Sequence, residues 1–126
     1  MIYCYTPFDD DFPYTEAKEM YEKNKESIGD DNTFEGLLKD TLFFAFKEDK
    51  KLIGCIYYYT LEDNLWYVNA FAGRKTHLTN LKCFKWSLNG FQSDIYAKTK
   101  QRLVRICLNK LGFEKINENL YRYSRR

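Results

Sequence analysis

The segment from Leu65 to Phe91, LWYVNAFAGRKTHLTNLKCFKWSLNGF, places an aromatic strand, a short basic turn and an amphipathic helix in direct succession. A strand that turns into a helix leaves free backbone N–H groups at the helix start, and the helix dipole adds partial positive charge there. Such a corner is suited to hold a phosphate, and Arg74 and Lys75 strengthen that preference. The segment therefore predicts either an anion-binding corner or a simple turn.

The rest of the chain alternates between strand and helix patterns. Strands are predicted where large apolar residues alternate, and helices where they recur every three or four residues. The predicted strands cover residues 1–5, 43–47, 51–60, 65–71 and 94–98, with a final strand or hairpin within 114–123. The predicted helices start at an N-cap on Thr15, span 34–42, follow the basic turn at 72–77, and start again at Thr99 or Lys100.

Two glycines have specific predicted roles. Gly54, inside a strand pattern, predicts a bulge or a close backbone approach. Gly112 is placed as the C′ residue of the last helix, with Phe113 making the hydrophobic contact after it. The apolar face of that helix is predicted to point inward through Leu103, Ile106, Cys107 and Leu111.

The order of elements predicts an α/β fold in one domain that spans residues 1–126, a length sufficient for an independent core. A three-strand meander favours antiparallel pairing, whereas the two later helices favour parallel connections. We therefore expect a single mixed, mostly antiparallel central sheet flanked by helices on both faces.

The charges are distributed unevenly along the chain. Residues 1–73 carry 7 Lys or Arg against 15 Asp or Glu, a net charge of −8, whereas residues 74–126 carry 13 against 3, a net charge of +10. A basic half suggests a phosphate-bearing small molecule, nucleic acid or an acidic protein surface. Two solvated faces of opposite sign explain the same numbers, so both interpretations stay open.

The cysteines indicate free thiols rather than a metal site. Cys4, Cys55, Cys83 and Cys107 form no C-x-x-C motif, and the chain has one His, so no zinc or other metal site is predicted. The sequence shows no signal peptide and no apolar run near 18 residues, so we expect a cytoplasmic protein that does not enter a membrane.

Two segments resemble the GNAT superfamily of acyl-CoA N-acyltransferases, and in particular its small phage-type members. The hairpin FFAFKEDKKLIGCIYYY is similar to that family's second and third strands, and QRLVRICLNKLGF is similar to its last helix. The resemblance covers nearly the whole chain. It implies the acyl-CoA N-acyltransferase fold and acetyl-CoA as the cofactor.

The resemblance also implies where the cofactor lies. In that family the fourth strand pairs with the pantetheine and the following turn holds the pyrophosphate. At the turn, His77 and Thr79 stand where the family has glycines, so the turn either contacts the phosphates through its side chains or is a vestige. The implied cofactor-binding residues are Val68, Asn69, Ala70, Phe71, Arg74, Lys75, Thr76, His77, Leu78, Thr79 and Gln101.

Acyl transfer to an amine requires a base, donors for the oxyanion and an acid for the leaving thiolate. The position at which the family often has a tyrosine acid holds Leu108, so Tyr96 is the substitute candidate. Glu62 and Asp94 are the candidate bases, together with Asp63. A packed strand aromatic and solvated turn residues explain the same side chains without catalysis.

Three functions follow from these observations. The first is acetyl transfer from acetyl-CoA to an amine of a protein or a small molecule. The second is a catalytically silent domain of the same fold with a phage-type structural or host-protein interaction role. The third, nucleic-acid binding through the basic C-terminal half, is less favoured because a solvated terminus explains those charges. A monomer or a homodimer is expected.

Overall fold

The computed structural model describes residues 1–28, 32–72, 77–99 and 102–124, and only the backbone of residues 27, 77–80 and 103. Within these residues, seven strands form one sheet in the order β1-β2-β3-β4-β5-β7-β6. The strands are β1 (Ile2–Tyr5), β2 (Leu42–Glu48), β3 (Lys51–Thr60), β4 (Trp66–Ala72), β5 (Ile95–Lys98), β6 (Glu114–Lys115) and β7 (Leu120–Tyr123). The neighbours β4 and β5 run parallel, and the other neighbouring pairs run antiparallel.

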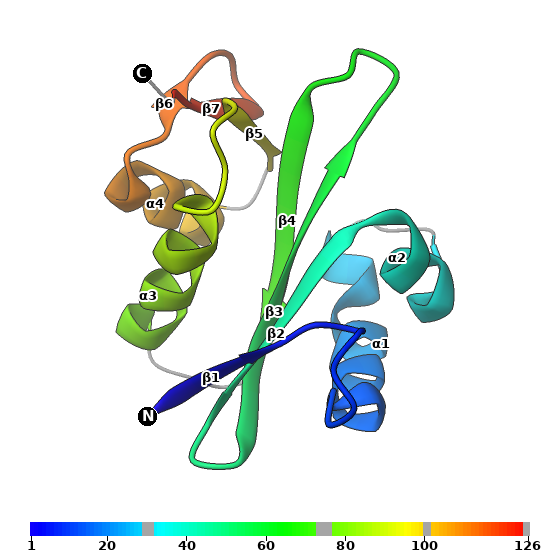
Figure 1. Ribbon diagram of the computed structural model, residues 1–126. Coiled ribbons are helices and arrows are strands. Elements are labelled where there is room, and N and C mark those ends of the chain that lie inside the picture. The colour runs from blue at the N-terminus through cyan, green and yellow to red at the C-terminus, as the bar shows by residue number, and fades with distance from the viewer. Residues whose placement is uncertain (29–31, 73–76, 100–101, 125–126) are drawn as a thin grey trace.

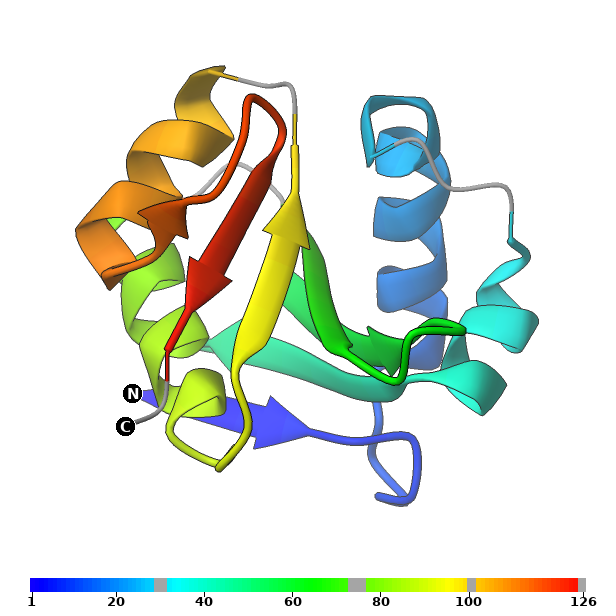
Figure 2. The same cartoon turned by 90° about the horizontal axis from the view of Figure 1, so that it is seen from above.

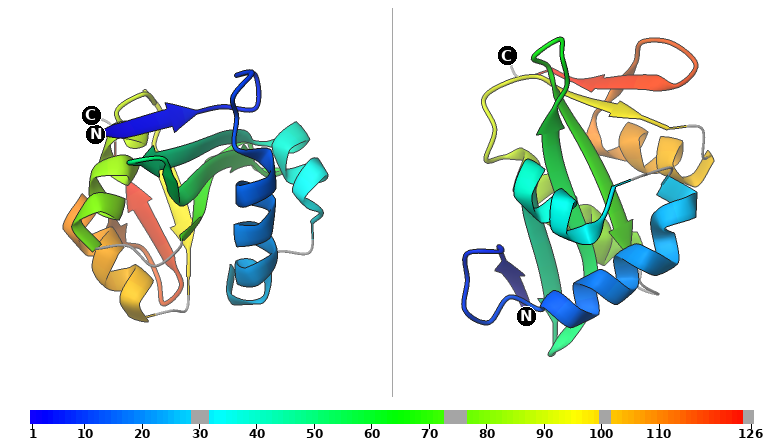
Figure 3. Two further views of the ribbon diagram at one scale, coloured as in Figure 1. Left: turned by 90° about the horizontal axis from the view of Figure 1, so that it is seen from below. Right: turned by 90° about the vertical axis from the view of Figure 1, so that its right-hand side faces the viewer.

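The helices cover both faces of the sheet. They are α1 (Tyr14–Ile28), α2 (Phe34–Asp40), α3 (His77–Leu88) and α4 (Arg102–Leu111). Figure 1 shows α1 and α2 on one side of the sheet and α3 and α4 on the other, and the views in Figure 3 show the same layers. The predicted α/β class, with a mixed and mostly antiparallel sheet between helices, is confirmed.

Strand alternation divides the core into two clusters. Successive side chains of a strand point to opposite faces, so neighbouring tyrosines of β3 belong to different clusters. Tyr58 faces α3 and α4 together with Ile95 and Leu108, whereas Tyr57 faces α1 and α2 together with Phe71. Both clusters contain many aromatic rings, which accounts for much of the high aromatic content of the sequence.

The predicted hairpin of β2 and β3 is confirmed, but Lys47 and Glu48, predicted in its turn, pair with β3, so the turn has two residues. Asp49 and Lys50 have φ angles of 50° and 71°, the left-handed values that a tight hairpin requires. The register shifts between Phe46 and Lys47, opposite Gly54. A Cβ on Gly54 would lie 3.1 Å from the carbonyl oxygen of Phe71 on β4. Both the predicted bulge and the predicted close approach are therefore confirmed.

The last helix ends as predicted. Gly112 has a φ of 97°, its N–H donates to the carbonyl of Asn109, and the N–H of Phe113 donates to the carbonyl of Leu108. These two bonds form a Schellman motif. The inward orientation predicted for Ile106 is wrong, because Leu108 is buried and lies about 200° away from Ile106 around the helix.

Three predicted element boundaries are also corrected. α1 begins at Tyr14, because the carbonyl of Pro13 accepts the first helical hydrogen bond, so Thr15 lies inside the helix. α2 ends at Asp40, because Leu42 pairs with β3 as the first residue of β2. Ala72 belongs to β4 rather than to the turn, since it pairs with Gly54.

The cysteines agree with the expectation of free thiols. None of the four cysteines forms a disulfide; Cys55 and Cys83 are buried, whereas Cys4 and Cys107 are partly exposed. The described residues contain no group of His, Cys, Asp and Glu side chains that could hold a metal ion. In the same residues, no helix is long and apolar enough to cross a bilayer.

Candidate active site

The strands β4 and β5 pair over a short distance and then diverge. Trp66 pairs with Ile95 and Tyr67 with Tyr96, and the described residues show no further pair between these strands. β4 continues along β3 as far as Ala72, whereas β5 continues along β7. Figure 1 shows β5 beside only the end of β4 at which that strand begins. From Val68 onward, one edge of β4 is therefore left without a neighbouring strand.

A cavity of about 1010 Å³ lies at this divergence. Its lining includes β4 from Val68 to Ala72 and the end of β5 from Ala97 onward. Helices from both layers contribute as well, with Asn24 from α1 and Leu108 from α4. Because its lining comes from both helix layers, the cavity extends through the sheet where β4 and β5 part. A ligand in it would contact a strand edge and both faces of the molecule.

The unpaired edge of β4 carries one side-chain contact of its own. The side-chain carbonyl of Asn69 accepts a hydrogen bond from the backbone N–H of Ala70 at 2.8 Å. An unpaired strand edge is a template for an extended chain that carries amide groups. Such a ligand would compete with the Asn69 side chain for the N–H of Ala70.

Several solved structures of similar overall fold are acetyltransferases. An N-acetyltransferase from Staphylococcus aureus Mu50 superposes with a TM-score of 0.74 at 15% identity, over 98% of this chain and 97% of that chain. Aminoglycoside 6'-acetyltransferase type Ii superposes with a TM-score of 0.69 at 13% identity, over 100% of this chain and 97% of that chain. A GNAT family acetyltransferase from Elizabethkingia anophelis with acetyl-CoA bound gives 0.60 at 17% identity, over 93% and 77%. No protein-family model and no curated protein sequence matches the chain.

The fold is that of the GNAT acetyltransferases. At identities of 15%, 13% and 17%, these structures share the architecture of the chain. The fold that the sequence resemblance implied is therefore the fold that these solved structures share with the chain.

The predicted coenzyme-binding residues of this GNAT fold divide into three groups. Val68, Asn69, Ala70 and Phe71 all line the cavity. His77, Leu78 and Thr79 form the first turn of α3, and their side chains are outside the description. Arg74, Lys75, Thr76 and Gln101 lie outside the described residues altogether. The structure thus brings the predicted strand segment to the cavity, and the roles of all these residues stay predictions.

The predicted catalytic residues are not among the described residues that line the cavity. Tyr96 lies on β5 at the last pair before the strands diverge, with its ring centroid 5.8 Å from that of Tyr67. Glu62 is exposed in the turn before β4, and Asp94 immediately precedes β5. Both carboxylates therefore lie toward the paired end of β4 and β5. Their catalytic roles stay predictions.

Lys98 is a residue of the cavity that the prediction did not include in the site. Ile95 and Ala97 of β5 face α3 and α4, so Tyr96 and Lys98 point to the opposite face of the sheet. Lys98 lines the cavity, and its Nζ lies 5.0 Å from the ring centroid of Tyr67. The signal in the sequence was the alternation of Ile95 to Lys98, but it did not show that β5 leaves β4 there.

Tyr67 and Asp63 form a polar contact beside Lys98. The Tyr67 hydroxyl donates to Asp63 Oδ2 at 2.7 Å, and the backbone N–H of Leu65 donates to Asp63 Oδ1 at 3.0 Å. The bond with the carboxylate raises the pKa of Tyr67 to about 12, and the same bond lowers the pKa of Asp63. Tyr67 is therefore neutral and Asp63 ionised at neutral pH.

The thiols in the cavity are poor nucleophiles. Cys55, Cys83 and Cys107 all line it. Burial raises the pKa of Cys83 to about 11, and it also raises the pKa values of Cys55 and Cys107. Since the thiolate is the reactive form, these side chains act as apolar lining near neutral pH.

Proposed function

We propose that the chain is an N-acyltransferase that moves an acetyl group from acetyl-CoA to an amine of a protein or a small molecule. The observation that carries this proposal is the cavity of about 1010 Å³ between the diverging strands β4 and β5. Its volume is at the upper end of the range for ligand pockets, about 300–1,000 Å³. The GNAT fold of the chain supports the same assignment.

The residues of the cavity fit the acyl-pantetheine part of the coenzyme. Its extended chain carries amide groups, and β4 from Val68 to Ala72 offers an unpaired edge beside apolar side chains. When bound, acetyl-CoA would supply a thioester whose acyl carbon is attacked by the amine. The chain itself would hold the arm, exclude water and orient the acyl group.

The proton of the amine has no receptor among the described lining residues, which include no Asp, Glu or His. The amine must therefore arrive neutral or pass its proton to a water molecule, from which Glu62 or Asp94, outside the described lining, would accept it. We expect the rate to rise with pH through the pKa of the acceptor's own ammonium, which is about 8 for an α-amino group and about 10.4 for a Lys side chain. Tyr96 remains the proposed acid, and Glu62 and Asp94 remain the proposed bases, each acting through water.

Thermal unfolding with acetyl-CoA tests the proposal. A ligand that binds the native state stabilises it by mass action, so the Tm should rise with acetyl-CoA concentration. Coenzyme release with a panel of amines, followed by mass spectrometry of the acetylated product, then tests turnover. Free coenzyme A and adenosine 3′,5′-bisphosphate are the controls that separate recognition of the pantetheine arm from recognition of the phosphates. A Tm that does not change with millimolar acetyl-CoA would refute the coenzyme assignment.

The second candidate is a domain of the same fold that serves a structural or host-protein interaction role without catalysis. The absence of a carboxylate or His among the described lining residues favours it, as does Leu108 at the position of the family's tyrosine acid. This alternative predicts that no amine is acetylated, even where acetyl-CoA raises the Tm.

A further inference from the structure

The part of the cavity lining beside β5 is rich in hydrogen-bond donors and carries one charge. Lys98, Thr99, Asn117 and Asn119 line it together. The N–H of Thr99 donates to the carbonyl of Asn119 at 2.9 Å, which ties the end of β5 to the turn between β6 and β7. Among the described lining residues, Lys98 is the one with a charged side chain.

The ammonium of Lys98 is available for a ligand. No carboxylate of the described residues lies within 4.0 Å of it, and the ammonium makes a cation–π contact with the ring of Tyr67. Asp63 is near enough for Lys98 to lower its pKa, but its oxygens accept hydrogen bonds from Tyr67 and Leu65. A cation over an aromatic ring gains less interaction free energy than a cation paired with a desolvated carboxylate, so a ligand carboxylate would bind the Lys98 ammonium more strongly than the ring does.

We infer that the acceptor is an amine that also carries a carboxylate, and that Lys98 binds this carboxylate. The inference rests on the proposed function and specifies its substrate class. The ammonium would attract the carboxylate of the acceptor, and the amides of Asn117 and Asn119 would offer further donors. The same positive charge would disfavour the ammonium form of a nearby amine, which assists a site whose described lining contains no base.

The position of Lys98 favours a contact with the acceptor over a contact with the coenzyme. Its side chain points to the face of the sheet that carries Tyr67, whereas the cavity wall opposite consists of α3 and α4 residues such as Phe84 and Leu108. An acceptor carboxylate at Lys98 would place the attached amine near the point where β4 and β5 part, next to the edge of β4 proposed for the pantetheine arm.

The test compares acceptors that differ in the carboxylate, at a pH above the pKa of each amine so that both members of a pair are in the neutral form. L-amino acids are paired with their carboxamides, and peptides that begin with Asp are paired with peptides that begin with Asn, so that free amino acids and acidic peptides are distinguished. In the full chain with acetyl-CoA, the carboxylate member should have a kcat/KM higher by about tenfold or more. Lys98→Gln should remove this preference and Lys98→Glu should reverse it, whereas Lys115→Gln, at an exposed position outside the cavity lining, should keep it.

Binding measurements give a readout that does not depend on turnover. Saturation-transfer NMR should detect the carboxylate member of each pair on the wild-type chain, and Lys98→Gln should weaken this signal without changing the Kd of acetyl-CoA. Equal binding of carboxylates and carboxamides would overturn the inference. So would a loss of acetyl-CoA affinity in Lys98→Gln, because it would make Lys98 a coenzyme contact. If acetyl-CoA does not bind but carboxylates bind through Lys98, the proposed function fails and the anion site stands.

Discussion

Tyr67 and Tyr96 form the last pair that joins β4 to β5, and the cavity begins with the next residue of each strand, Val68 and Ala97. The site therefore arises from the end of a parallel pairing rather than from a loop. Figure 2 shows β5 and β7 in yellow and red beside the helices α3 and α4, with α1 on the other side of the sheet. A rigid strand edge with space beside it suits an extended ligand better than a compact one.

A large side chain on the unpaired edge of β4 should block the coenzyme. Ala70 is partly exposed and lines the cavity, so Ala70→Trp would fill space at the proposed pantetheine position. We expect the Kd for acetyl-CoA to rise by about tenfold or more, because a large group displaces the ligand from its contacts. Isothermal titration calorimetry measures the change. Lys115→Trp, on the exposed strand β6, is the matched control and should bind as the wild type does.

A Cβ at Gly54 should strain the contact between β3 and β4. It would lie 3.1 Å from the carbonyl oxygen of Phe71 and 3.3 Å from Cβ of Ala72. We expect Gly54→Ala to lower the free energy of unfolding by about 1–3 kcal/mol, as overpacking generally does. Urea denaturation measures this. Gly90→Ala, whose new Cβ would meet only the carbonyl of Ser87 at 3.4 Å, should change stability by less than about 1 kcal/mol. Equal effects of both substitutions would contradict the strain.

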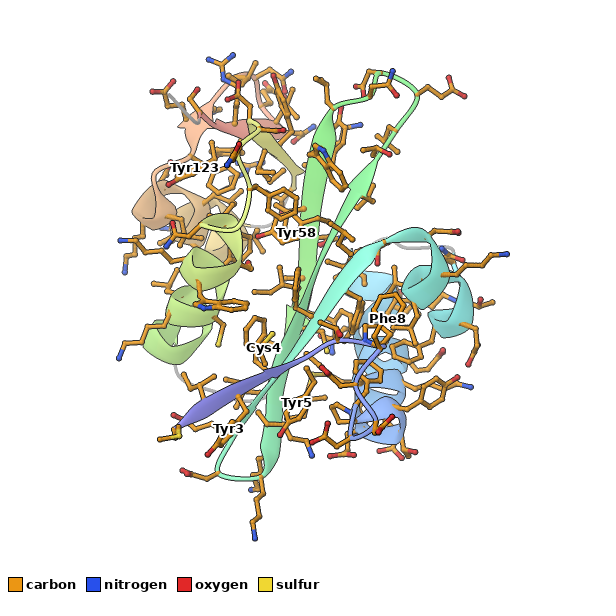
Figure 4. All side chains as sticks on the ribbon, in the orientation of Figure 1. Tyr3, Cys4, Tyr5, Phe8, Tyr58 and Tyr123 are labelled. Atoms are coloured by element: carbon orange, nitrogen blue, oxygen red, sulfur yellow. The ribbon has the colours of Figure 1, made fainter. Side chains whose placement is uncertain are left out.

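The buried hydroxyls of Tyr58 and Ser87 should be coupled. Their oxygens lie 2.6 Å apart, and Ser87 also donates to the carbonyl of Phe84 at 2.8 Å, so Tyr58 is the donor to Ser87. Figure 4 shows Tyr58 between the sheet and α3. Ser87→Ala leaves a buried donor without an acceptor, which typically costs about 1–3 kcal/mol.

A double-mutant cycle with Tyr58→Phe measures the coupling of these hydroxyls by urea denaturation. The loss of stability in the double variant should be smaller than the sum of the two single losses, because the second substitution removes the orphaned hydroxyl. Additive losses would show that Tyr58 and Ser87 act independently.

The stability of the contact between α1 and α2 should depend on pH in the acid range. The Glu35 carboxylate accepts hydrogen bonds from the Tyr14 hydroxyl and from Lys18 Nζ, and these bonds, that of Tyr14 foremost, lower its pKa to about 2. A depressed native pKa gives stability that is present above the ordinary value near 4.5 and is lost as the pH falls toward 2.

Glu35→Gln tests this dependence. The variant should show a smaller fall of the unfolding midpoint in urea between about pH 4.5 and 2 than the wild type. Glu26→Gln, at an exposed position of α1, is the control and should keep the slope of the wild type. If the unfolding midpoint of Glu35→Gln falls with pH as steeply as that of the wild type, the Glu35 contact does not contribute to the stability.

Local patterns in the sequence predicted most of the fold. The alternation from Phe43 to Thr60 predicted the hairpin. Gly112 was predicted to end the last helix because that position requires a left-handed φ, which few residues other than glycine adopt. The errors lie at boundaries and on α4, where the predicted apolar face included Ile106 and not Leu108, whereas the structure buries Leu108 and leaves Ile106 exposed. Periodicity predicts that a helix has an apolar side, but it does not show which residue lies at the centre of that side.

The sequence by itself determined most of the elements and the class of sheet, because these depend on periodicity and on residues close together in the chain. The role of Val68 to Phe71 as a ligand edge is implied by the resemblance to the GNAT superfamily and stays a prediction. The tertiary structure alone decided that β4 and β5 part after Tyr67 and Tyr96, and that Lys98 stands at the opening while Glu62 and Asp94 lie toward the paired end. The physical reason is that strand divergence depends on how the twisted sheet packs between two helix layers, which no local pattern encodes.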